Sequence, residues 1–181
     1  MNVSLEYLQR CSAQTGYRVE PLEKVVRLGG MAADVARHPF LGSVLALKGG
    51  TASNLCFGPP QRLSVDLDYN YIGHLDRAAM LEARPAVEQA VADLARRQGY
   101  RVQQSADAFA GRKYYLLYRS VVGPEERIEV DLNFLFRMPI ERIGREEGPD
   151  YAPPAPVLSA WIVFAHTARR IVTSYRRKRA Q

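Results

Sequence analysis

Lys48-Gly49-Gly50-Thr51-Ala52 and, after a short apolar turn, Arg62-Leu63-Ser64-Val65-Asp66-Leu67-Asp68-Tyr69-Asn70 are the two segments with the strongest pattern in this sequence. In the second segment, apolar or aromatic residues occupy the odd positions from Leu63 to Tyr71, and polar residues occupy the even ones. This alternation is typical of a β-strand with one face on a core. Asp66 and Asp68 are therefore expected to point the same way, roughly 7 Å apart along the strand.

The chemistry of these two segments indicates a site for a metal ion and a phosphate. Two carboxylates at that separation raise each other's pKa, and a divalent cation between them relieves the repulsion. The paired glycines allow a backbone to approach an anion closely, and amides at a helix start would hold a phosphate. The alternative is that the alternation only separates a solvated face from a buried one. The combination of glycines, helix start and paired carboxylates favours the site.

A second alternating segment runs from Arg127 to Phe134 and places Glu129, Asp131 and Asn133 on one face. If this strand lies next to the first, a further carboxylate reaches Asp66 and Asp68. The spacing alone does not choose between Glu129 and Asp131. An exposed strand face with incidental acidic residues is the alternative interpretation.

The glycine segment followed by Arg62-x-Ser64-x-Asp66-Leu67-Asp68 resembles the AbiEii/AbiGii branch of the DNA-polymerase-β-like nucleotidyltransferases. These are the toxin halves of type IV toxin–antitoxin pairs, and they include the mycobacterial MenT toxins. The resemblance covers about residues 20–135. It implies an α+β, polymerase-β-like nucleotidyltransferase fold with a mixed central sheet flanked by helices. It also implies transfer of nucleotides, expected to be pyrimidines from CTP or UTP, to the 3′ end of tRNA, which blocks translation. The implied partner is a cognate AbiEi-like antitoxin.

The same resemblance implies the roles of individual residues. It places the third metal carboxylate at Asp131, so that Asp66, Asp68 and Asp131 are the expected catalytic residues and the ligands of two Mg²⁺ ions. The expected nucleotide-binding residues are Lys48, Gly49, Gly50, Thr51, Arg62, Ser64 and Lys113. Each of the three cations in that set has the alternative of being a surface charge. A phosphate on Ser64 would crowd the metal site, which gives the antitoxin a hypothetical route to silence the enzyme.

Two other functions stay open from the sequence. The first is nucleotidyl transfer to a protein or a small molecule, as in relatives that modify aminoglycosides. The second is a catalytically inactive module that binds RNA or a partner and has kept only the fold.

Composition favours a soluble protein with a polyanionic partner. The chain has 181 residues, a net charge of +6 and a pI near 9.5, which agrees with an RNA acceptor but does not select one. Its two cysteines lack CxxC spacing and are expected to be reduced thiols in the cytoplasm. Neither a signal peptide nor an apolar run of membrane-spanning length is recognised. We expect a monomer or weak oligomer without a membrane partner.

The remaining pattern predicts a domain over residues 1–147 and a proline-rich linker with a basic helix over 148–181. Helices are expected at 3–12, 21–37 and 51–55, and two more between Asp76 and Gly99, the second beginning at Pro85. A buried strand is expected at 43–47, further strands at 100–102 and 112–122, and a helix at 158–175. Relatives usually continue into a longer helical half, so this chain departs from them after the linker.

Overall fold

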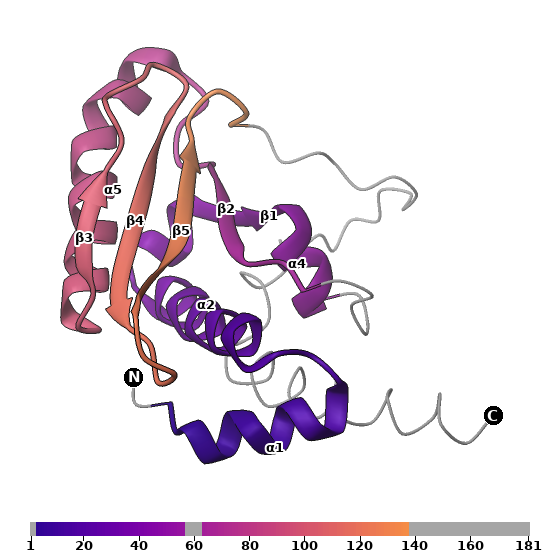
Figure 1. The fold of residues 1–181 in the computed structure, drawn as a ribbon. Helices are drawn as coiled ribbons and strands as arrows, with labels where there is room; N and C mark the ends of the chain where they lie inside the picture. Colours follow the sequence, from indigo (N-terminus) through magenta and orange to yellow (C-terminus); the bar gives the residue numbers. More distant parts are fainter. Residues whose placement is uncertain (1–2, 57–62, 138–181) are drawn as a thin grey trace, which may run out of the picture.

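The structure is a computed structural model, and it describes residues 3–56 and 63–137 (Figure 1). Five helices and five strands are found in these ranges. The helices are α1 (Leu5–Thr15), α2 (Val19–Arg37), α3 (Leu41–Val44), α4 (Gly49–Cys56) and α5 (Arg77–Arg97). The strands are β1 (Leu45–Lys48), β2 (Asp66–Tyr71), β3 (Arg101–Gln104), β4 (Gly111–Arg119) and β5 (Glu125–Asn133).

The five strands form one mixed sheet in the order β1-β2-β5-β4-β3. The central pair, β2 and β5, is parallel, and the other neighbours are antiparallel. A parallel pair needs a long crossover, and here α5, β3 and β4 lie between the two strands in the chain. The expected α+β architecture, with a mixed sheet flanked by helices, is therefore confirmed.

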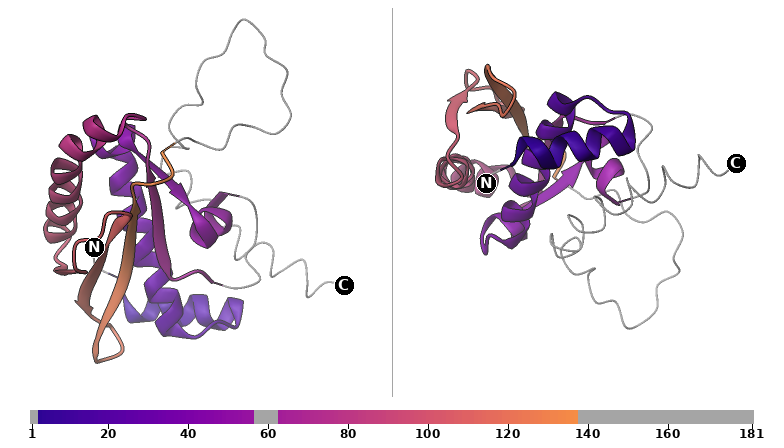
Figure 2. Two further views of the ribbon diagram at one scale, coloured as in Figure 1. Left: turned by 90° about the horizontal axis from the view of Figure 1, so that it is seen from above. Right: turned by 60° about the horizontal axis from the view of Figure 1, so that its bottom comes forward.

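Helices α2 and α5 cover one face of the sheet, and α1 packs mainly against α2 (Figures 1 and 2). The core lies between these two helices and the sheet. Its strand residues alternate along each strand, as expected for a sheet with one face buried. They are Leu67, Tyr69 and Tyr71 from β2, Tyr114, Leu116 and Tyr118 from β4, and Ile128, Val130 and Leu132 from β5. The residues between them point to the opposite face.

Several local predictions needed correction. One uninterrupted helix, α5, replaces the two helices expected on either side of Pro85. Proline costs this helix one hydrogen bond, but Met80, Val87 and Val91 are fully buried on the sheet, and this packing outweighs the local preference. Residues 43–44 belong to the short helix α3, and β1 is an edge strand of which only Leu45 is buried.

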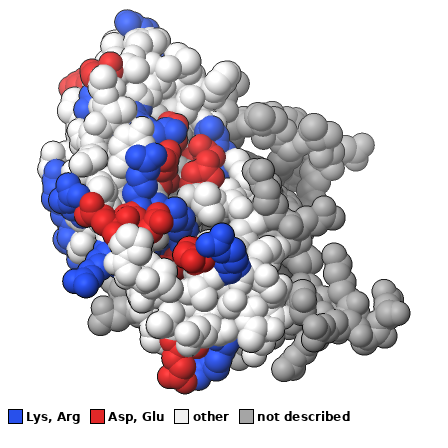
Figure 3. Space-filling view, in the orientation of Figure 1, with Lys and Arg blue, Asp and Glu red and all other residues white. Residues whose placement is uncertain are grey.

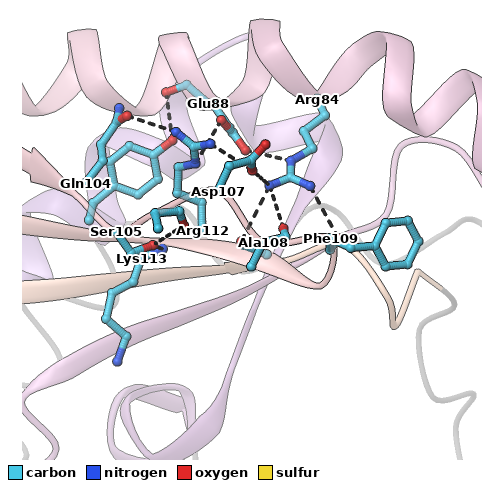
Figure 4. Close-up of polar contacts among 12 residues, drawn as sticks. Arg84, Glu88, Gln104, Ser105, Asp107, Ala108, Phe109, Arg112 and Lys113 are labelled. Atoms are coloured by element: carbon cyan, nitrogen blue, oxygen red, sulfur yellow. Dashed lines mark hydrogen bonds and ion pairs between the residues drawn. The ribbon is translucent and has the colours of Figure 1, made fainter.

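A polar network ties α5 to the segment between β3 and β4 (Figure 4). The Arg84 guanidinium is 2.7 Å from carboxylate oxygens of both Glu88 and Asp107, and it also donates to the carbonyl oxygens of Ala108 and Phe109. Its side chain is only 9% exposed. The network fixes the start of β4, the strand that carries Lys113 on the other face of the sheet.

The predicted linker and basic helix at 148–181, and with them the proposed domain boundary, lie outside the described residues. Within the described ranges, no helix has the length and apolar character needed to cross a membrane.

Candidate functional site

Charged side chains form a row across the sheet on the face opposite α2 and α5. The register pairs Lys48 with Asp68, Asp68 with Asp131, and Asp131 with Lys113. Directly paired residues share a face of the sheet, so two carboxylates lie between two ammonium groups. Figure 3 shows this face, with acidic and basic side chains interleaved across its middle.

A second row lies on the same face of the sheet, two residues along the strands from the first. It pairs Asp66 with Glu129, and Glu129 with Tyr115. The parallel pairing of β2 and β5 thus brings Asp66, Asp68 and Asp131 onto one face at neighbouring positions. Asp66 is exposed, whereas Asp68 and Asp131 are half-buried. The structure therefore brings together the three carboxylates that the sequence singled out.

The charges of the row act on the carboxylate of Asp68. Its pKa is raised above the ordinary value, first because partial burial removes water from the carboxylate and then because Asp66 and Asp131 repel its negative charge. Lys48 and Lys113 act in the opposite direction. A further cation placed among these carboxylates would be attracted by all three.

Lys113 makes ionic contacts with carboxylates of both rows. Its ammonium lies 3.2 Å from Oε2 of Glu129 and 3.8 Å from Oδ2 of Asp131. The hydrogen bond that the Lys113 ammonium donates to Glu129 is the main reason that the pKa of Lys113 is raised. Figure 4 shows the Lys113 side chain pointing away from α5, toward the face that carries the carboxylates.

The two glycines lie inside the first turn of α4 and not in a loop before it. Gly49 has φ +74°, and a Cβ added to it would lie 2.4 Å from Oδ2 of Asp68. A Cβ on Gly50 would lie 3.0 Å from Oγ of Ser64. The close approach expected from the diglycine is thus present, and in this structure the anion that it admits is the carboxylate of Asp68.

Thr51 connects α4 to the carboxylate strand, and Ser64 contacts the first carboxylate of that strand. The buried Thr51 hydroxyl donates to the backbone carbonyl of Asp66 at 2.5 Å, so its side chain holds α4 against β2. The Ser64 hydroxyl donates to Oδ1 of Asp66 at 2.9 Å, which places Ser64 directly beside the first carboxylate.

Sequence reasoning missed some features of the site, and one of the expected residues is not described by the structure. Arg62 lies outside the described residues. The ion pair of Glu129 with Lys113, and a second one with Arg127 at 3.2 Å, were not predicted. The alternation of β5 contained a signal for the second pair, since Arg127 and Glu129 stand two positions apart and share a face.

The fit of the site to a divalent metal rests on the type and register of its donors. Carboxylate oxygens are the ligands that Mg²⁺ prefers, and Asp66, Asp68 and Asp131 provide them from adjacent strands. Within residues 3–56 and 63–137, no group of three or more His, Cys, Asp or Glu side chains converges closely enough to hold a metal ion. The donor chemistry fits, and closer convergence of the side chains is required for binding.

Comparison with known proteins supplies the family. The model of a family described as "Nucleotidyl transferase AbiEii toxin, Type IV TA system" matches residues 33–172. The match covers well over half of the chain and includes α4, all five strands and every carboxylate of the two rows. Neither the curated proteins nor the solved structures contain a significant match. The chain therefore belongs to the AbiEii family of nucleotidyltransferase toxins of type IV toxin–antitoxin systems.

Proposed function

We propose that this protein transfers nucleotides from a nucleoside triphosphate to the 3′ end of tRNA and so stops translation. Family membership supports nucleotidyl transfer by a toxin. The observation that carries the proposal for this chain is the pairing of Asp68 with Asp131, beside Asp66 and next to the start of α4. CTP and UTP are the proposed donors, and the proposed activity is like that of the mycobacterial MenT toxins within the polymerase-β-like superfamily.

In this proposal, Asp66, Asp68 and Asp131 hold two Mg²⁺ ions. When bound, divalent ions at such a site neutralise phosphate charge and lower the pKa of an attacking hydroxyl. Asp131, which lies between Asp68 and Lys113 in the row, is the proposed acceptor of the proton of that hydroxyl. The hydroxyl oxygen forms a bond to the α-phosphorus while the bond to pyrophosphate breaks.

The triphosphate is proposed to lie along the start of α4 between the two lysines of the row. Backbone amides at a helix start and flanking ammonium groups both favour a phosphate chain. Lys48 lies at the end of β1 directly before Gly49, and Lys113 lies on the other side of the carboxylate pair. These positions let each ammonium meet a different part of a triphosphate held between them.

A separately encoded, AbiEi-like antitoxin is the proposed partner. Phosphorylation of Ser64 is one proposed means of inhibition. The Ser64 hydroxyl lies 2.9 Å from Oδ1 of Asp66, and a phosphate there would add negative charge beside the metal carboxylates. Direct binding of the antitoxin over the site is the other.

The test is incubation of the purified protein with labelled CTP, UTP, ATP or GTP, Mg²⁺ and total tRNA. We expect label on tRNA. Label on a protein or a small molecule would mean that tRNA is not the acceptor. No label under any condition would mean that the protein is only a binding module.

Asp66→Ala is the control variant for this assay. The variant is expected to be inactive yet folded, because Asp66 is exposed and its carboxylate has one described hydrogen bond, from Ser64. The substitution also removes a negative charge that repels the carboxylate of Asp68. Retained transfer by a folded Asp66→Ala protein contradicts the assignment of the site.

A further inference from the structure

Glu129 is a fourth carboxylate on the face of the sheet that carries the site, and both of its oxygens are paired with cations. Oε2 lies 3.2 Å from the Lys113 ammonium, and Oε1 lies 3.2 Å from the guanidinium of Arg127. The Glu129 side chain is 28% exposed, so these contacts are partly shielded from water. Each oxygen thus already has a cation beside it, whose charge would repel a metal ion that approached the same oxygen.

Arg127 holds Glu129 from the side away from Asp131. Its guanidinium stacks over the ring of Tyr115 at 4.8 Å, and Tyr115 is the residue directly opposite Glu129 on β4. Stacking on an aromatic ring restricts a guanidinium that would otherwise be mobile. The order Tyr115, Arg127, Glu129, Lys113 therefore forms a continuous chain of contacts that ends at the site.

The position of Lys113 depends on this chain. Its ammonium is closer to Glu129, at 3.2 Å, than to Asp131, at 3.8 Å. If Glu129 loses its charge, Asp131 becomes the nearest acidic partner among the described side chains. An ammonium drawn onto Asp131 would compete with a divalent ion for the same carboxylate.

We propose that Glu129 is a positioning residue, which holds the Lys113 ammonium beside the Asp68 and Asp131 pair, within reach of a triphosphate and out of the metal position. This inference rests on the proposed function. It also separates the roles of the two β5 carboxylates that lie in the charged rows: Asp131 acts on the metal and the hydroxyl, and Glu129 acts through Lys113.

The test is a kinetic double-mutant cycle with Glu129→Gln, Lys113→Met and the double variant, in full-length protein with the most active NTP. We expect Glu129→Gln to raise the KM for NTP about fivefold and to raise the Mg²⁺ concentration needed for half-maximal rate. In the Lys113→Met background, Glu129→Gln is expected to change neither quantity, because its target is gone.

Glu125→Gln is the matched control. Glu125 is on the same strand and pairs with Arg101 at 2.7 Å, but its side chain is 55% exposed and it lies outside the two charged rows. We expect its KM, kcat and Mg²⁺ requirement to match those of the wild type. A merely structural role of Glu129 would lower the melting temperature and leave the KM for NTP at the control value.

The outcomes separate this inference from the proposed function. Absence of NTP-dependent transfer by the wild type overturns both. Transfer by the wild type, with an equal effect of Glu129→Gln in the presence and absence of Lys113, overturns only the inference and makes Glu129 a direct metal or substrate contact. Loss of the effect in the Lys113→Met background supports it.

Discussion

Gly49→Ala is expected to disable the site through displacement of one carboxylate. The new Cβ would lie 2.4 Å from Oδ2 of Asp68, whereas ordinary van der Waals contact begins near 3.4 Å. The carboxylate would therefore have to move by about 1 Å, a displacement that can cost about a hundredfold in rate at a catalytic site. Labelled-NTP transfer to tRNA at saturating Mg²⁺ measures this loss.

The substitution also has a cost in stability that must be separated from the effect on the site. Gly49 has φ +74°, and a residue with a Cβ in this left-handed conformation costs about 1–2 kcal/mol. For a protein of this size, that lowers the melting temperature by about 2–8 °C. Thermal unfolding followed by circular dichroism measures it.

Gly99→Ala is the control that shares the strain but not the contact. Gly99 has φ +88°, and a Cβ there would meet no atom within 4 Å. Both variants should lose similar stability, and only Gly49→Ala should lose transfer. If the two retain equal activity, the contact between Gly49 and Asp68 is irrelevant to function and the reasoning is refuted.

Two further variants test the electrostatics and the scaffold. Asp68→Asn should be more stable than the wild type at pH 7 without metal, because the raised native pKa means that folding opposes ionisation. The gain in stability should vanish as the pH falls toward 3.8, the ordinary pKa of aspartate. Urea unfolding of both proteins at several pH values measures this trend, and a difference in stability that does not change with pH would contradict the prediction. Arg84→Met should lose about 2–3 kcal/mol in urea unfolding, because it leaves partly buried acceptors without their cation. Arg101→Met, which breaks an exposed pair, should lose less than about 1 kcal/mol, and equal losses would refute the role of burial.

The alternating segments predicted much of the site because a strand has a period of two residues. Asp66 and Asp68 had to share a face if the segment was a strand, and so did Glu129 and Asp131. Asp76 marked the start of a helix correctly, since a side-chain cap is a local feature. Pro85 misled because its local cost is smaller than the packing of the helix that contains it.

Which strands became neighbours was decided only by the tertiary structure. The parallel pairing of β2 with β5 sets Asp68 opposite Asp131, and this register depends on the crossover through α5 and on the common buried face of both strands. The choice between Asp131 and Glu129 was open in the sequence for the same reason. In our proposal this choice depends on the ion pairs of Glu129 with Lys113 and Arg127. Strand pairing and side-chain packing fix these contacts, and local periodicity carries no information about either.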